Sequence, residues 1–350
     1  MTVSIIVPCY NVASYLDRFF ESIIGQTHRQ LEIIIVNDGS TDETLAGLRR
    51  YVPKLEECGF SVNLIDQQNR GLAGAVDTGL KYVSGEFLTW PDPDDWLTPD
   101  SIERRVELMR EFPDAGLLRT ASKLFIQKYD KLEGHIGLID GPPRIVDNIF
   151  GRHFLGRTHY HPVCHFVRTE AFLATTGRSI HVAPGGNSQN LQMLLPLSER
   201  YPTIEAGDIC AFYTVRDDSR SRRDVTALPK IKRTHMLLDN LLQTIPKLCG
   251  NHDQYGRVAE QAWLRNRVLM LAFEGNCPEE GIQVLDRCGF GSLRARLVRV
   301  LLRLKAKLFP HNNQITLEGQ KAPLSSRAFL KLVWFNPDSV SLPLKADDKN

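Results

Sequence analysis

Three carboxylates lie within four positions of the chain, at Asp92, Asp94 and Asp95, shortly after the apolar run 87–90. Aspartate is a poor strand former, and like charges repel at short range, so this crowding is costly without a compensating charge. The cheapest compensation is a cation, or a cationic loop, that the carboxylates share. Hard divalent ions take oxygen ligands of this kind. The alternative interpretation is a solvated acidic turn that caps the next helix.

A second group of residues with chemistry to offer is the histidine-rich segment 159–165. It carries His159, His161 and His165, which share one face if the segment is a strand, because side chains alternate along a strand. A histidine near its ordinary pKa works as a general base, and a pair on one face can hold a metal. The other interpretation is ordinary strand or loop histidines.

Alternating strand and helix patterns position these residues. Four apolar runs predict buried strands at 3–7, 31–36, 62–65 and 87–90. Helical periodicity predicts helices between them, which favours an α/β fold with a mostly parallel sheet and helices on both faces. Ligands bind at the carboxyl ends of strands in such sheets. Three polar turns follow these ends, at 8–11, 37–42 and 91–95, so we expect a ligand site there.

The second half of the chain has a looser pattern. We predict a strand over 161–167, a helix over 189–201 and a strand over 209–215. Helices then follow at 228–248, 258–273, 279–288 and 293–309. We therefore expect two domains, an α/β domain over 1–225 and a helical C-terminal region over 226–350.

The charge of the chain is unevenly distributed. Residues 1–225 hold 24 Lys and Arg against 30 Asp and Glu, whereas residues 226–350 hold 19 against 11. The segment 292–309 has six Arg or Lys and no acid. On a helix its apolar stripe comprises Leu293, Leu297, Val300, Leu301, Leu304 and Leu308, opposite Arg296, Arg299, Arg303 and Lys307. This pattern predicts a helix at an anionic membrane surface. The alternative is a helix packed on its own domain.

Composition favours a cytoplasmic protein that docks on the inner face of the membrane. The seven cysteines are scattered without a Cys-x-x-Cys pair, which indicates reduced thiols. No stretch reaches eighteen apolar residues, so we expect no spanning helix. The acidic front and the lack of an RNA-binding motif argue against nucleic acid as a partner.

Four segments in order, "SIIVPCYN", "IIIVNDGSTD", "NRGLAGAVDTGL" and "TWPDPDDWLTPD", resemble family 2 glycosyltransferases of the GT-A fold, of the bacterial cell-surface polysaccharide type. The resemblance covers the expected nucleotide-sugar half, residues 1–120, and fades through an acceptor half, residues 121–225. It implies a Rossmann-like fold. It also implies inverting transfer of a sugar from a nucleotide-diphosphate sugar to a glycan or lipid-linked acceptor. A UDP-sugar is the expected donor.

The resemblance also assigns residues to the donor. The base and ribose map to Pro8, Tyr10, Asn11, Asn37 and Asp38, and further nucleotide contacts map to Arg70 and Gly71. Asp92-Pro93-Asp94 resembles the family's Asp-x-Asp signature, which places Mn²⁺ or Mg²⁺ on Asp94 and puts Asp92 on the ribose or the metal. The segment 213–224 resembles a loop that closes over the nucleotide, with Arg216 and Arg222 on the diphosphate. Two departures are Asn37 for a commoner Asp and Val76-Asp77 for Arg-Asn.

The catalytic base is the point at which the sequence departs furthest from the family. Gln189 and Asn190 stand where a Glu-Asp pair is common, and an amide is no general base. We favour a displaced base, with His161 first. The other candidates are Asp208, Asp217 and Asp218. A rival hypothesis is a catalytically impaired nucleotide-sugar-binding scaffold of a glycan assembly complex, and a weaker one is a nucleotidyltransferase.

Overall fold

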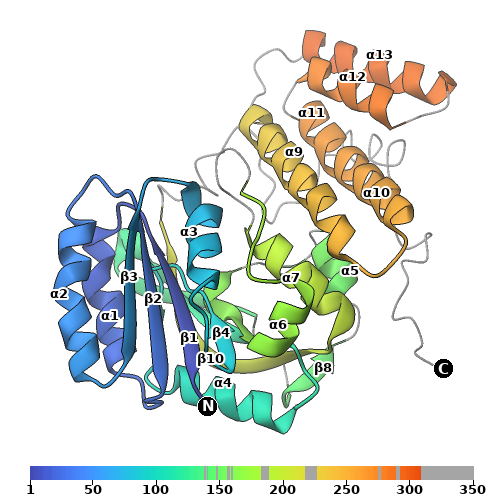
Figure 1. Ribbon diagram of the computed structural model, residues 1–350. Coiled ribbons are helices and arrows are strands. Elements are labelled where there is room, and N and C mark those ends of the chain that lie inside the picture. Colours follow the sequence, from blue (N-terminus) through green and yellow to red (C-terminus); the bar gives the residue numbers. More distant parts are fainter. Residues whose placement is uncertain are drawn as a thin grey trace, which may run out of the picture. The chain divides into compact units, whose positions relative to one another are not determined.

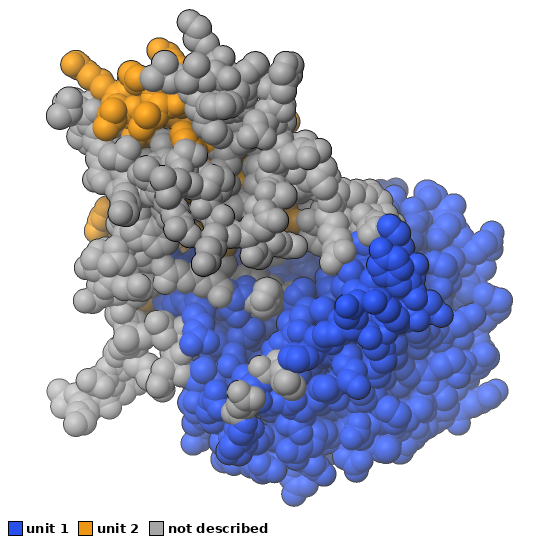
Figure 2. Space-filling view, turned by 180° about the vertical axis from the view of Figure 1, so that it is seen from behind, with its two compact units in different colours: residues 1–216 blue, residues 217–350 orange. Residues whose placement is uncertain are grey.

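The computed structural model describes residues 1–137, 139, 141–146, 149–155, 158, 161–182, 189–216, 227–274, 277–288 and 292–308. The chain forms two compact units, Met1–Arg216 and Asp217–Asn350 (Figure 2). The domain boundary predicted at residue 225 lies outside the described residues, so it stays a prediction.

One ten-stranded sheet runs through the first unit, in the order β3-β2-β1-β4-β9-β6-β10-β5, with β7 beside β6 and β8 beside β10 (Figure 1). The strands are β1 Val3–Cys9, β2 Leu31–Asp38, β3 Ser61–Gln67, β4 Phe87–Thr89, β5 Trp96–Leu97, β6 Leu117–Ile126, β7 Lys131–Ile136, β8 Arg144–Val146, β9 His165–Arg168 and β10 Thr203–Val215. Strands β3, β2, β1 and β4 are parallel, and so are β6 and β10. Strand β9 lies antiparallel between β4 and β6 and joins the two halves.

Helices cover both faces of this sheet (Figure 1). On one face lie α1 Leu16–Ile24, α2 Thr44–Glu57 and α4 Ser101–Glu111, and on the other α3 Gly71–Leu80, α6 Thr169–Thr175 and α7 Gln189–Arg200. The sequence explains the division, because alternate residues of each strand point to opposite faces. In β1, Ile5 and Val7 join the core under α1, whereas Ile6 joins the core under α3. The short elements are η1 Ala13–Tyr15, η2 Gln127–Tyr129, α5 Ile149–Phe154 and η3 Pro162–Cys164.

The predicted α/β sheet is confirmed, and its first four strands lie where the apolar runs placed them. The strand predicted over 161–167 is wrong at its start, since residues 162–164 form the 3-10 helix η3 and β9 begins at His165. Pro162 lacks the N–H that a strand ladder needs, which accounts for the turn. Strand β6 was not predicted from the sequence, because Arg119, Thr120 and their polar neighbours interrupt its apolar pattern.

The second unit is helical. Its elements are α9 Ala227–Thr244, η4 Ile245–Lys247, α10 His252–Glu260, the π-helix η5 Gln261–Val268, α11 Leu269–Glu274, α12 Pro278–Arg287 and α13 Ser292–Leu308. Across the described part of the chain, no helix is long and apolar enough to cross a membrane.

Helix α13 packs on α11 and α12, and the residues buried there lie outside the apolar stripe that was expected at a membrane. Val298 and Leu302 are buried there, and Leu302 lies over Gly281 of α12. Leu297 and Val300, which belong to the predicted apolar stripe, are 46% and 52% exposed. Val298 and Leu302 therefore pack against the other helices, while Leu297 and Val300 of the stripe are exposed.

Candidate active site

The turns after β1 and β2 are bonded to one another. The side-chain oxygen of Asn11 accepts a hydrogen bond from the backbone N–H of Thr41 (2.8 Å), and the Asn11 N–H donates to Ser40 Oγ (3.1 Å). Asn11 has a φ of 53°, a left-handed conformation that asparagine tolerates better than most residues. The turn leaves Tyr10 exposed, whereas Pro8 is buried within β1. The first two predicted donor-binding turns are therefore side by side.

The end of β2 presents two buried acceptor atoms without a partner. Asn37 donates its side-chain N–H to Asp66 (2.7 Å), and Asp38 Oδ1 accepts from Gln67 Nε2 (2.6 Å) and the Arg70 N–H (2.8 Å). Asn37 Oδ1 and Asp38 Oδ2 are buried with no hydrogen bond. An unpaired buried acceptor costs about 1–3 kcal/mol, so these two atoms suit a ligand that brings donors.

The Val76-Asp77 departure has a structural role. Asp77 pairs with the Arg70 guanidinium (3.2 Å), and it also accepts from Ser179 Oγ (2.7 Å) and the Ile180 N–H (3.1 Å). The Arg70 side chain therefore lies along α3, the helix that follows it and begins at Gly71 with a φ of 76°. The acid holds Arg70 and anchors a distant segment to α3.

The acidic turn after β4 is held by the end of β10. Asp95 is buried, and its Oδ1 accepts from the Thr214 N–H (2.8 Å) while Oδ2 has no partner. Burial, and then the charges of Asp94 and Asp92, raise the pKa of Asp95 well above its ordinary value. The Thr214 hydroxyl donates to the backbone carbonyl of Asp94. The crowding of negative charge read from the sequence is therefore present in three dimensions.

A protein arginine supplies the shared cation. Arg216 Nη2 lies 2.9 Å from Asp94 Oδ2, and its Nη1 donates to the Tyr15 hydroxyl (3.3 Å). A second arginine, Arg18, donates to the carbonyl of Asp94 (3.3 Å) and lies 4.0 Å over the Trp96 ring. A cationic side chain is one of the two compensations that the sequence allowed.

The carboxylates also fit a divalent ion. Asp95 Oδ2 is an orphaned buried oxygen, and Asp94 and Asp92 stand beside it in the same turn. Within the described residues, no three His, Cys, Asp or Glu side chains are grouped to hold a metal by themselves. An ion here would therefore complete its shell with diphosphate and water oxygens, as Mg²⁺ does.

His161 lies against the end of β10. Its ring packs edge-on against Tyr213, with 4.2 Å between the ring centroids, and Tyr213 immediately precedes Thr214. Another predicted base, Asp208, is committed to an ion pair with Arg104 (2.8 Å). His159, Asp217, Asp218 and Arg222 lie outside the described residues.

The amides that replace the family's acids have a packing role. Asn190 Oδ1 accepts the indole N–H of Trp90 (2.8 Å), and Gln189 is buried as the first residue of α7. Trp90 is the last residue before the acidic turn. Asn190 therefore fixes the start of that turn across 100 residues of sequence. No local pattern in the sequence indicated this contact, nor those of Thr214 and Arg18.

Comparisons with known proteins identify chains that this one resembles. Residues 4–175 match the family Glycosyl transferase family 2. Glycosyltransferase GlyA of Streptococcus pneumoniae is 38% identical over 110 residues, 31% of this chain and 15% of GlyA. The chain spans less than half the length of GlyA and of two further curated relatives.

Two solved structures share the fold. The S. aureus TarS 1–349 complex with UDP-GlcNAc aligns with a TM-score of 0.62 at 17% identity, covering 89% of this chain and 93% of that one. The mannosyltransferase PcManGT from Pyrobaculum calidifontis, in complex with GDP-Man and Mn²⁺, aligns with a TM-score of 0.52 at 18% identity, covering 94% and 83%. The expected GT-A fold is confirmed.

Replacing Arg216 by glutamine is expected to raise the affinity of the nucleotide-free protein for Mn²⁺, by up to about tenfold, because the cation that shares Asp94 is removed. Free Mn²⁺ measured by electron paramagnetic resonance checks this. Arg104→Gln is the control, since it breaks an ion pair of the same unit that does not touch the acidic turn. Equal affinities in both variants would contradict a competition at Asp94.

Proposed function

Residues 4–175 form a Glycosyl transferase family 2 domain, and on that premise we propose that this protein transfers a sugar from a nucleotide-diphosphate sugar to a glycan or lipid-linked acceptor. We place this reaction in the synthesis of a cell-surface polysaccharide. One observation carries the proposal: the unpaired acceptors of Asn37 and Asp38 end strand β2, and the acidic turn follows β4, so both lie at the carboxyl ends of parallel strands. The acceptors suit a nucleotide base and ribose, and the acidic turn suits a cation with its diphosphate.

The donor would lie along this edge from β2 to β4. The Asn37 amide can pair with a uracil edge, and Asp38 can accept a ribose hydroxyl. The complexes of TarS and PcManGT contain UDP-GlcNAc and GDP-Man respectively, so a UDP-sugar is our first choice of donor and a GDP-sugar the second. Pro8, Tyr10 and Gly71 would form the walls of the donor site. Arg70 would break its ion pair with Asp77 and contact the nucleotide.

Asp94 and Asp92 would hold Mn²⁺ or Mg²⁺, which stabilises negative charge on the departing diphosphate. Arg216 would add to this, because a guanidinium pairs as well with phosphate oxygens as with a carboxylate. Arg222 has the same proposed role. Asp95 supports the turn through Thr214 rather than by contact with the donor.

His161 would take the proton of the attacking acceptor hydroxyl on a ring nitrogen. His161 packs on Tyr213, and the next residue, Thr214, donates its N–H to Asp95. This position supports His161 as the base over Asp208, whose carboxylate is paired with Arg104. Direct attack with the base on the opposite side from the leaving group gives inversion at the sugar carbon. Gln189 and Asn190 would then position groups rather than move protons.

A scaffold that binds donor without turnover is the second candidate. The amide at position 190 favours it, because the family's usual acid is absent there and the Asn190 side chain is engaged by Trp90. Turnover separates the two functions, since a scaffold never releases the nucleotide.

We place the protein in the cytoplasm, docked on the inner membrane surface through α13. Leu297 and Val300 are exposed on this helix, and Arg296 and Arg303 are exposed beside them. Exposed apolar residues with flanking cations fit the interface of an anionic bilayer. A lipid-linked acceptor would be presented there.

Asp94→Asn is expected to reduce release of nucleoside diphosphate by about 100-fold or more, because it weakens the cation site while keeping the side-chain shape. The assay would use UDP- and GDP-sugars with and without Mn²⁺, with an extract of lipid-linked glycans as acceptor. The exposed Asp114→Asn is the matched control. If wild-type protein binds donors and releases no nucleotide, the scaffold function replaces this one.

His161→Gln is expected to lower turnover by about 100-fold while leaving the donor Kd within about twofold, because a lost base affects proton transfer and not donor binding. The acidic limb of the pH profile for turnover should disappear in the variant. Isothermal titration with UDP gives the affinity. An unchanged profile would move the base to another residue.

The double variant Leu297→Ser/Val300→Ser and the double variant Arg296→Gln/Arg303→Gln should each bind anionic vesicles about tenfold or more weakly than wild type. Sedimentation with phosphatidylglycerol–phosphatidylcholine vesicles measures this, and pure phosphatidylcholine reports the charge dependence. Leu132→Ser/Ile145→Ser removes equally exposed apolar residues from the first unit and is the control. If both α13 variants bind vesicles as well as wild type does, the membrane-binding surface is not on α13.

A further inference from the structure

The side-chain amide of Asn37 can present either its oxygen or its N–H to a ligand, and a neighbouring residue decides which. Asn37 is 1% exposed, and the register of β2 with β3 places it beside Asp66. Its Nδ2 donates to Asp66 Oδ1 at 2.7 Å, whereas its Oδ1 is buried without a hydrogen-bond partner. The atom that Asn37 leaves for a ligand is therefore an acceptor.

The charge of Asp66 fixes this orientation of the amide. An ionised carboxylate only accepts hydrogen bonds, so Asn37 can meet it with an N–H and not with its oxygen. Turning the amide over would break a charge-assisted hydrogen bond and bring two acceptor oxygens together. We expect the turned amide to be disfavoured by more than about tenfold.

The second unpaired atom at the end of β2 is also an acceptor. It is Oδ2 of the Asp38 carboxylate, whose Oδ1 accepts from Gln67 Nε2 at 2.6 Å. The amide of Gln67 is oriented in turn by the Thr78 hydroxyl, which donates to Gln67 Oε1 at 2.6 Å. Both unpaired atoms therefore require hydrogen-bond donors, and a ligand that turns a bare nitrogen toward either of them meets repulsion.

Nucleotide bases differ in what they offer to such an acceptor. In a nucleotide, uracil keeps a single ring N–H, at N3, and guanine keeps a single ring N–H, at N1. Cytosine and adenine carry a bare nitrogen at the matching positions, and that nitrogen is itself an acceptor. Proteins read unpaired bases by hydrogen bonds to this edge, so the polarity of one amide can separate the two groups of bases.

We propose that Asp66 is a positioning residue that gives the donor site its base selectivity. By holding the Asn37 amide with its oxygen toward the base, Asp66 admits uracil or guanine through a ring N–H and rejects cytosine and adenine. The inference rests on the proposed function, and it names a residue and a selection that the proposed function leaves open. Asp66 acts through Asn37 and not by contact with the donor.

The selection appears as a difference in nucleotide affinity. A base that presents a bare nitrogen leaves Asn37 Oδ1 unpaired in a buried place, and sites with buried polar groups reject such ligands strongly. We expect UDP to bind at least about tenfold more tightly than CDP, and GDP to bind more tightly than ADP by a similar factor.

Isothermal titration of the full chain with UDP, CDP, GDP and ADP, in the presence of Mg²⁺, tests this selection. Asp66→Asn keeps the size of the side chain but can either accept from Asn37 or donate to it, so the Asn37 amide can turn over. The variant is expected to lower the ratio of UDP affinity to CDP affinity by about fivefold or more, mainly because CDP binds more tightly.

The control is Asp114→Asn, the same change at an exposed site away from this edge, which should keep the wild-type ratio. If Asp66→Asn also keeps the wild-type ratio, the proposal is overturned, even where both affinities fall, because a loss of packing alone weakens UDP and CDP alike.

Exchange of the two side chains gives a second test. In the double variant Asn37→Asp/Asp66→Asn, the amide at position 66 can donate to the carboxylate at position 37, whose other oxygen again faces the base. Its affinity ratio should lie within about threefold of wild type. Asn37→Asp alone places two carboxylates side by side and should bind UDP at least about tenfold more weakly than the double variant. A double variant without the preference for UDP would overturn the role of Asp66.

The titrations separate this inference from the proposed function. If wild-type protein binds UDP and CDP equally, or prefers CDP, the base selection is overturned while the donor site stands. If it binds none of the four nucleotides, the proposed function fails and this inference fails with it.

Discussion

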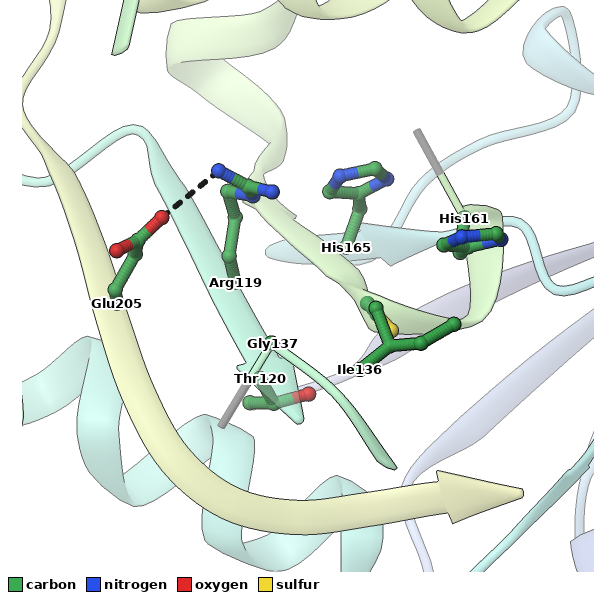
Figure 3. A pocket seen from close by; sticks show the side chains of 8 residues that line it. Arg119, Thr120, Ile136, Gly137, His161, His165 and Glu205 are labelled. Carbon is green, nitrogen blue, oxygen red and sulfur yellow. Dashed lines mark hydrogen bonds and ion pairs between the residues drawn. The ribbon is translucent and has the colours of Figure 1, made fainter. Parts of the chain in front are cut away.

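The first unit is organised around the need to hold three carboxylates together where little water reaches them. Asp95 is the deepest of these, and the backbone of Thr214 and the side chain of Arg216 stabilise the turn that carries it and Asp94. Both come from the last residues of β10. That strand pairs with β6 through shifts of register near Ile209 and Ala211, and such irregularities bend a strand. The bend is visible in Figure 3. The end of the strand contacts the acidic turn through the Thr214 N–H, which donates to Asp95.

The donor half of the fold could be predicted from the sequence because its information is local. Strand β1 is apolar apart from Ser4, so its burial on both faces can be predicted from its residues alone. Strand β6 was not predicted because its polar residues Arg119 and Ser122 are paired with Glu205 and Cys164, which come much later in the chain. The sequence around a polar strand residue does not indicate which distant residue will form its hydrogen bonds.

The same distinction applies to the site. Asp92, Asp94 and Asp95 were found because they are neighbours in sequence, whereas the arginine that compensates them lies 122 positions beyond Asp94. The resemblance had pointed Arg216 to a phosphate, and the structure shows it on a carboxylate. His165 was grouped with His161 for a strand face that does not exist, yet η3 and β9 bring both to one cavity. Contacts between distant parts of the chain determine these positions, and the periodicity of the sequence does not predict such contacts.

The bond between Asn190 and Trp90 has an evolutionary consequence. An aspartate at position 190 would accept the same indole N–H, so exchange between amide and acid leaves the anchoring of Trp90 intact. Descendants of this protein could therefore gain or lose an acid beside the transfer site without first repairing the fold. The anchoring of Trp90 and the acid–base character of position 190 can therefore change separately.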